Sequence, residues 1–187
     1  MRAVDDPEAA HELWRTGRDR LFRESPDSPL PAGDPLRQTG LPVWPYDPAM
    51  RATSPLLAAP PTDLELDGGA DGPVRMARVG SVRLPVVGDP TVDVWRLEQY
   101  AGGLFVPLRD DTAGQGSYGG GRYLLDTAKG ADLGEDGNGD LVVDLNFLYH
   151  PSCRYDPAWT CPLAQPGNRI AARVEAGERM GRPTRAA

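Results

Sequence analysis

The sequence predicts a mainly β protein, an antiparallel β-sandwich or partly open barrel with an N-terminal helix packed on it. The 187 residues include 20 prolines and 22 glycines, a composition that favours short strands separated by turns. Eight short apolar segments follow residue 62, and no helical pattern separates them. This arrangement favours antiparallel pairing over an α/β sheet.

The N-terminal segment has the pattern of an amphipathic helix. Asp6 can cap the helix and Pro7 can occupy its first position, where the missing N–H costs nothing. The helix should end before Pro26. Residues at three- and four-residue spacing form the stripe that needs a packing surface: Ala10, Leu13, Trp14, Gly17, Leu21 and Phe22.

Residues 25–61 are rich in proline, which excludes long regular structure. Trp44, Tyr46 and Met50 indicate that this segment wraps around the protein and packs on it, since a flexible linker would not normally carry them.

The predicted strands follow, with turns at 80–81, 88–90 and 102–103. We expect one domain over residues 1–178 and a disordered tail over 179–187, which has no anchoring apolar residue. The strand candidates are Thr62–Leu66, Val74–Val79, Val82–Val87, Val92–Leu97, Leu104–Leu108, Arg122–Asp126, Leu141–Leu145 and Arg169–Glu175.

The charge and the hydropathy pattern narrow the possible partners. A net charge of −7 argues against nucleic acid, because phosphate binding needs a basic patch. No apolar run approaches the roughly 20 residues that span a bilayer, and the N-terminus lacks the apolar region of a secretory signal. The sequence therefore predicts a cytoplasmic protein that does not bind membranes.

Two glycine-rich motifs resemble known sites only formally. GQGSYG at residues 114–119 matches G-x-G-x-x-G, but a strand pattern follows it where a dinucleotide site requires a helix. DLGEDGNGD at residues 132–140 lacks the glycine and glutamate of a calcium-binding EF-hand loop. We interpret both as hairpin turns, and we expect no cofactor and no metal.

Cys153 and Cys161 leave three alternatives open. They could be buried structural thiols, a disulfide or redox pair, or, with His150, metal ligands or a nucleophile with its base. Two cysteines in a chain of this length do not form a disulfide framework.

Polar residues are also concentrated in the sequence around Arg122. Arg122 and Asp144 each lie in an apolar, strand-like context, where an unpaired charge is expensive. Either they pair in a structural network, with each other or with another residue, or Arg122 binds a carboxylate or phosphate of a ligand.

Three motifs together resemble the bacterial family called domain of unknown function 1684. The first is SPL at 28–30 with GLPVWPYDPAMR at 40–51, the second is RDDTAGQGSYGGGRYL at 109–124, and the third runs from DLNFLYHPSC at 144 to EAGE at 175–178. The resemblance covers nearly the whole chain and implies no known substrate, cofactor or catalytic residue. The family usually has Asn at the position of His150, which argues against His150 as a general base or zinc ligand. Leu145 and Trp44 also depart from the pattern, which usually has Phe at both positions.

The leading hypothesis is a pocket for a small anionic ligand, with alternatives of a structural or protein-interaction module and of a thiol-redox protein that uses Cys153 and Cys161. Burial of Arg122 in an ion pair with Asp144 or Glu175 would favour the structural alternative. The candidate ligand-binding residues are Arg122, Tyr118, Tyr123, Asp110, Thr112, Asp144, Asn146 and Tyr149.

Overall fold

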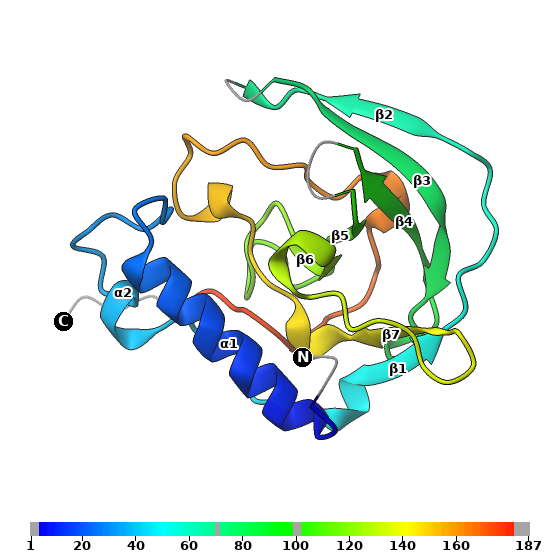
Figure 1. The fold of residues 1–187 in the computed structure, drawn as a ribbon, viewed down its shortest axis with the longest axis horizontal. Coiled ribbons are helices and arrows are strands. Elements are labelled where there is room, and N and C mark those ends of the chain that lie inside the picture. Colours follow the sequence, from blue (N-terminus) through cyan, green and yellow to red (C-terminus); the bar gives the residue numbers. More distant parts are fainter. Residues whose placement is uncertain (1–3, 70–71, 99–101, 182–187) are drawn as a thin grey trace.

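The computed structural model describes residues 4–69, 72–98 and 102–181. It confirms the predicted class: a mainly β protein with two antiparallel sheets and an N-terminal helix. The first sheet has the strand order β2-β3-β4-β5-β6, and the second consists of β1 and β7. In Figure 1 helix α1 lies on one side of the molecule and β2 and β3 on the other, with β6 and β7 between them.

Helix α1 (Pro7–Glu24) begins and ends where the sequence predicts. The side chain of Asp6 accepts a hydrogen bond from the Glu8 N–H at 3.0 Å, and Ser25 ends the helix before Pro26. The buried face differs from the predicted stripe, because Leu13 and Leu21 are about half exposed. The residues that pack inward are Ala10, His11, Trp14 and Phe22.

The larger sheet contains most of the predicted strands. They are β2 (Asp63–Leu66), β3 (Val74–Arg83), β4 (Thr91–Leu97), β5 (Leu104–Leu108) and β6 (Arg122–Asp126). Strand β3 contains the predicted strand 74–79 and the first two residues of the predicted strand 82–87, so the turn expected at residues 80–81 lies inside it. The rest of the second prediction was wrong, because Pro85–Val87 form a short 3-10 helix. A bulge between Arg78 and Gly80 shifts the register there, and Gly80 lets the backbone of Leu57 approach closely.

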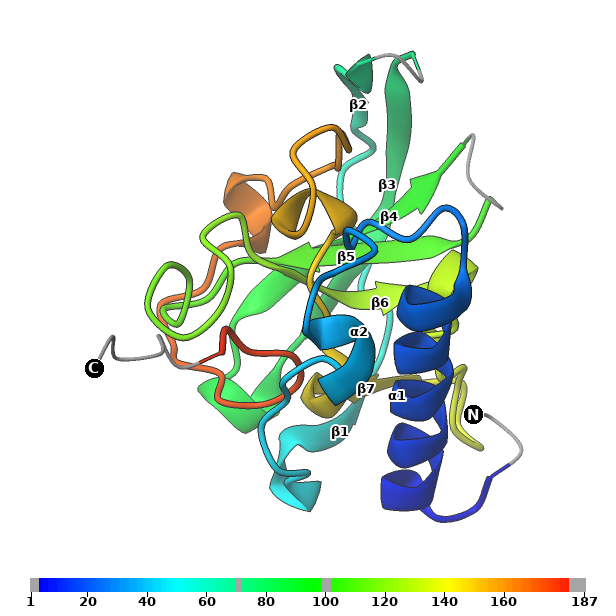
Figure 2. The ribbon, with the colours of Figure 1, turned by 90° about the vertical axis from the view of Figure 1, so that its left-hand side faces the viewer.

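The smaller sheet pairs a strand that the sequence did not predict with one that it did. Strand β1 (Arg51–Ser54) lies at the end of a proline-rich stretch and runs antiparallel to β7 (Leu141–Asp144), with Arg51 opposite Asp144. The short helix α2 (Leu36–Thr39) is also in the proline-rich region, and Figure 2 shows it beside α1.

Two predictions near the C-terminus were wrong. Residues 169–175 form a single bridge from Arg169 to Arg109 instead of a strand, because side chains bind their backbone groups. Arg179 and Met180, expected in the tail, donate backbone hydrogen bonds to the carbonyl groups of Pro42 and Gly116. Residues 182–187 lie outside the described residues.

The core has an aliphatic part and an aromatic part. The aliphatic part, between the two sheets, includes Val94, Leu124 and Leu145. The aromatic part includes Trp14, Trp95, Phe105, Phe147 and Tyr149, and Cys161 packs against it. The third motif therefore runs from the core at Asp144 to the surface, where its two cysteines lie half-buried, and returns to the interior at residues 176–178.

Candidate functional site

Arg122, at the start of β6, is completely buried and bonded to the protein itself. One terminal nitrogen donates to Asp110 Oδ1 at 3.2 Å and to the carbonyl of Val174 at 2.8 Å. The other donates to the carbonyls of Ala176 and Glu178. The second oxygen of Asp110 accepts the Val174 N–H at 2.8 Å, so the ion pair holds residues 174–178 in an irregular path.

This geometry places Arg122 in an ion pair and not in a pocket, and its partner is Asp110 instead of the predicted Asp144 or Glu175. Thr112 supports the pair, since its hydroxyl bonds both Asp110 and Ser117. An anionic ligand at Arg122 would have to displace Asp110 and open the contacts to three carbonyl groups. The arrangement favours a structural role for Arg122, Asp110 and Thr112.

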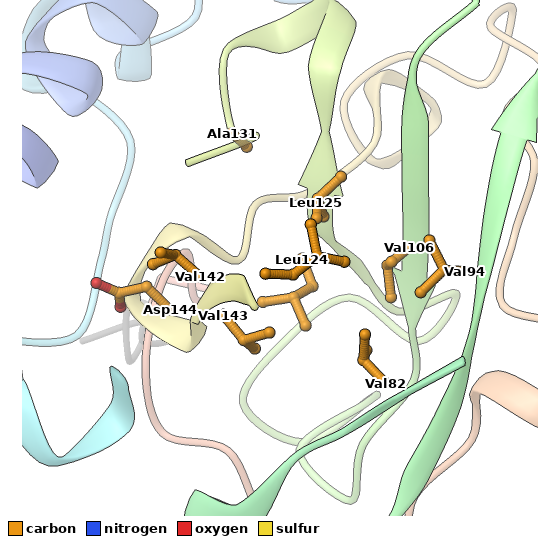
Figure 3. A pocket seen from close by; sticks show the side chains of 10 residues that line it. Val82, Val94, Val106, Leu124, Leu125, Ala131, Val142, Val143 and Asp144 are labelled. Atoms are coloured by element: carbon orange, nitrogen blue, oxygen red, sulfur yellow. The ribbon is translucent and has the colours of Figure 1, made fainter. Parts of the chain in front are cut away.

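Three hollows in the described part of the chain are lined by residues other than Arg122. The first is an apolar cavity of about 10 Å³ around Leu124. Figure 3 shows its lining, with the carboxylate of Asp144 turned away from the apolar side chains. That volume holds one water at most. Two open hollows of about 770 Å³ and 810 Å³ flank helix α1, and their lining residues include neither Arg122 nor the cysteines.

Asp144 and Asn146 attach the first motif to the third. Asp144 Oδ2 bonds Arg51 at 3.1 Å and the Tyr46 hydroxyl at 3.2 Å. The amide of Asn146 exchanges hydrogen bonds with the backbone of Asp47, at 3.0 and 2.9 Å. Both predicted ligand-binding residues therefore hold the proline-rich segment against β7.

Tyr149 and Tyr123 lie side by side in the aromatic core. The Tyr149 hydroxyl donates to Asp126 Oδ2 at 2.5 Å, and the two rings meet edge to face with centroids 5.4 Å apart. The Tyr123 hydroxyl is buried and makes no directed hydrogen bond within the described residues. Burial, reinforced by the charges of the nearby Cys161 and Cys153 sulfurs, raises the pKa of Tyr123 well above its usual range. The hydroxyl therefore keeps its proton.

Glu178 is the centre of a further buried network that joins helix α1 to the third motif. It accepts hydrogen bonds from Arg18, from the backbone N–H of His150 at 2.7 Å and from the Tyr155 hydroxyl at 3.0 Å. Arg18 also donates to the carbonyl of His150 and lies over the rings of Phe22 and Tyr149. Arg18 was not predicted as a site residue, although its place on the helix face between Trp14 and Phe22 was a usable signal.

His150 is a hydrogen-bond acceptor in this structure. Its Nε2 accepts the backbone N–H of Tyr118 at 3.1 Å, and its Nδ1 lies 3.6 Å from Glu178. Burial lowers the pKa of His150 to about 4, although Glu178 opposes the shift. The imidazole is therefore neutral near pH 7, and its accepting nitrogen is already occupied, which argues against a role as general base.

Cys153 and Cys161 meet at the surface beside Tyr118. The backbone N–H of Cys153 donates to Cys161 Sγ at 3.3 Å. The Cys153 thiol itself donates to the Tyr118 hydroxyl, with 3.9 Å between sulfur and oxygen. Both cysteines are free, with no disulfide between them, and both are half-buried. Of the predicted site residues, only these two and Tyr118 lie together and partly exposed.

The surroundings of the two thiols shift their pKa values in opposite directions. Interaction with the Cys153 side chain lowers the pKa of Cys161, and the hydrogen bond from the Cys153 backbone N–H acts in the same direction against the effect of burial. The neighbouring Cys161, together with burial, raises the pKa of Cys153. The pair therefore favours a thiolate at Cys161 over one at Cys153.

Other classes of site find little support within the described ranges. No group of three or more His, Cys, Asp or Glu side chains there is placed to hold a metal ion. None of the helices described has the length and apolar character needed to cross a membrane. Asp136 caps its own hairpin turn by accepting the N–H groups of Asn138 and Asp140, as expected for a solvated loop.

Comparison with known proteins gives a family and a fold. The solution NMR structure of an uncharacterized protein from Haloarcula marismortui shares 30% identity, covers 92% of this chain and 94% of its own, and superposes with a TM-score of 0.67. No curated protein matches the chain. The family described as "Protein of unknown function (DUF1684)" matches residues 37–179, which include all of the thiol site. The chain therefore belongs to the DUF1684 family.

Proposed function

We propose that Cys153 and Cys161 form a two-electron redox centre and that the protein takes part in thiol–disulfide exchange. The observation that carries this proposal is the adjacency of two partly exposed free cysteines, in which the Cys161 sulfur accepts the Cys153 N–H at 3.3 Å. Structural thiols are normally buried in apolar surroundings, which raise their pKa. Cys161 instead has donors that favour its thiolate.

The exchange takes two displacements. The Cys161 thiolate attacks one sulfur of a substrate disulfide, forms a mixed disulfide and releases the first substrate thiolate. Cys153 then loses its proton to solvent and attacks the Cys161 sulfur, which forms the intramolecular disulfide and releases the second substrate thiolate. The protein dithiol is oxidised by two electrons and the substrate disulfide is reduced by two. A reducing cytoplasm, the compartment that we propose for this chain, would return the pair to the dithiol.

The order of attack follows from the local donors. The thiolate is the nucleophile in exchange, so the sulfur with the lowered pKa attacks first. Cys161 has that position, supported by the hydrogen bond from the Cys153 N–H. Cys153 becomes a competent nucleophile only after Cys161 is bonded to the substrate, because the negative charge on the neighbouring Cys161 sulfur is then lost.

The test is stoichiometric. The reduced protein is treated with 5,5′-dithiobis(2-nitrobenzoate) at pH 7, and the released thiol and the protein mass are both measured. We expect two equivalents of released thiol, no retained label and a mass lower by about two protons, since Cys153 displaces the label from Cys161. Cys153→Ser should release one equivalent and keep one label, whereas Cys161→Ser should react much more slowly.

Two retained labels on the wild-type protein would overturn the proposal, because they would show two independent thiols. That result does not depend on whether the variants fold. Equal reaction rates for Cys153→Ser and Cys161→Ser would overturn the assigned order of attack.

The structural alternative applies to a different part of the molecule. Asp110 and three carbonyl groups occupy the two terminal nitrogens of Arg122 and leave only its buried Nε without a partner among the described residues, which supports a role in holding residues 174–178 over a role in binding an anion. A small anionic ligand would have to bind elsewhere or open this network, so we propose the network as scaffold for the thiol site.

A further inference from the structure

The surface around the thiols contains exposed apolar side chains and a glycine segment, residues 119–120, that has no side chains of its own. Large hydrophobic side chains are rarely exposed in the described part of the chain, yet two of them flank Cys161: Trp159, 39% exposed, and Leu163, 36% exposed. Single exposed hydrophobic residues need no explanation, but two beside a reactive sulfur form a patch.

The loop is built to present Trp159. The carboxylate of Asp156 accepts the Ala158 N–H at 2.9 Å, and the carbonyl of Asp156 accepts the Trp159 N–H at 3.1 Å. This turn fixes the backbone at Trp159, whose side chain is partly covered and does not belong to the described core clusters. The four residues 157–160 are all exposed, so the thiols lie at the base of a projecting loop.

The opposite side of the patch is the glycine segment that follows Tyr118. Leu163 lies against Gly120, where an added Cβ would be 3.2 Å from both of its methyl groups and 2.6 Å from the Tyr118 ring. Gly119 is exposed and has open space beside it. Tyr118, Leu163 and the glycine backbone thus form one continuous surface next to Cys153, whose sulfur is 3.9 Å from the Tyr118 hydroxyl.

The cations near the patch are engaged with the protein. Arg109 Nε donates to the carbonyl of Gly119, and Arg154 Nε donates to Met180 Sδ at 2.8 Å while its guanidinium lies over the Tyr155 ring. With a net charge of −7, the chain as a whole repels anions. Arg109 and Arg154 keep their charges, so an anionic disulfide is the comparison that separates charge attraction from apolar contact at this surface.

We propose, on the basis of the redox function above, that the substrate is a cysteine disulfide in an extended peptide or protein segment that carries apolar side chains next to the cysteine. Those side chains pack on Trp159 and Leu163, and the peptide backbone lies along Gly119 and Gly120. This contact places the substrate sulfur over Cys161 for the first displacement.

The experiment compares three disulfides as oxidants of the reduced protein. They are the disulfide-linked dimers of acetyl-GFCLG-amide and of acetyl-GSCSG-amide, and oxidised glutathione. The second-order rate constant of each is measured by acid quench and mass spectrometry, and is divided by the rate constant of the same disulfide with dithiothreitol. This ratio removes the intrinsic reactivity of each disulfide.

We expect the apolar peptide to have a ratio at least about tenfold above the serine peptide and oxidised glutathione. Trp159→Ala should reduce this preference to within about threefold, and Leu163→Ser should reduce it as well. Leu56→Ala is the matched control, since Leu56 is 44% exposed and packs on Gly80 of β3, and it should keep the full preference.

Equal ratios for the three disulfides in the wild-type protein would overturn this substrate class and leave the redox function standing. The same would follow if Trp159→Ala and Leu56→Ala behaved alike. If none of the three disulfides oxidised the pair, the redox function itself would be wrong.

Discussion

The Arg122 region and the thiol region belong to the same family motifs but treat their polar groups in opposite ways. Arg122 is completely buried, and its two terminal nitrogens are occupied by Asp110 and by three carbonyl groups. Cys153 and Cys161 are partly exposed, and their hydrogen bonds within the described residues are few: the Cys153 N–H donates to the Cys161 sulfur, and the Cys153 thiol donates to the Tyr118 hydroxyl. The first region is closed and stable, and the second keeps a nucleophile accessible.

The difference shows that density of polar residues does not by itself locate a function. Charged residues in an apolar context are expensive to bury, so they are retained only where a complete set of partners compensates them. A buried charge with such partners can therefore have a structural role as readily as a role in binding or catalysis. The reactive groups that stay partly exposed are the two thiols, which lie near the glycines at residues 119–120.

The largest effect is expected when Arg122, the buried cation that pairs with Asp110, is removed. Arg122→Met should lower the free energy of unfolding by about 3–5 kcal/mol, because it leaves Asp110 buried without its cation. Urea denaturation monitored by tryptophan fluorescence measures the change. Arg173→Met is the control, since Arg173 and its partner Glu175 are both more than half exposed and should contribute little.

A loss of less than about 1 kcal/mol for Arg122→Met would show that the pair is not structural and would reopen the ligand hypothesis.

A second prediction concerns the pH dependence of stability. His150 has a pKa of about 4 in the folded protein, below its value of about 6.5 in the unfolded chain. As the pH falls, the unfolded state takes up the proton first, so stability that is present above pH 6.5 is lost between pH 6.5 and 4. We expect a loss of about 2 kcal/mol between pH 7 and pH 5.

His150→Asn, which restores the usual family residue, should flatten this dependence because an amide oxygen can still accept the Tyr118 N–H. Denaturation curves at pH 7, 6 and 5 for both proteins provide the measurement. Parallel pH dependence in the two proteins would exclude His150 as its source.

A third prediction sharpens the thiol side of the comparison. Cys153→Ala removes the side chain whose interaction is the largest cause of the lowered pKa of Cys161, and it keeps the backbone N–H that donates to the Cys161 sulfur. We expect the midpoint of its alkylation rate with iodoacetamide to rise by about one pH unit, equivalent to about 1.4 kcal/mol. Tyr123→Phe should shift the midpoint in the same direction by less. An unchanged midpoint in Cys153→Ala would mean that the thiols do not interact.

The smallest effect on stability is expected for a substitution in the exposed loop at residues 157–160, between the two cysteines. Trp159→Ala should change the free energy of unfolding by no more than about 0.5 kcal/mol, because its side chain has no place in the core. Urea denaturation of the reduced protein tests this value. A loss above about 1.5 kcal/mol would assign Trp159 to the fold and weaken its role as a contact for substrate.

Local signals in the sequence were sufficient for several elements. The cap at Asp6 and the proline at position 7 located helix α1, and alternating apolar residues located β4, β5 and β6. Strand β1 was missed because prolines surround it, and its pairing with β7 depends on contacts across some 90 residues. The strand expected at 169–175 failed because Asp110 and Arg122 take backbone groups that a ladder would use.

The sequence by itself determined the fold class, the family motifs and the pair of cysteines as a candidate. Those properties follow from local patterns in the sequence: the spacing of apolar residues, the turn residues and the composition. Only the tertiary structure decided that Arg122 pairs with Asp110, that His150 accepts a hydrogen bond and that Cys161 and Cys153 share one. Each of these contacts depends on the path of an irregular segment, and long-range packing sets such paths because the segments have no regular pattern of their own.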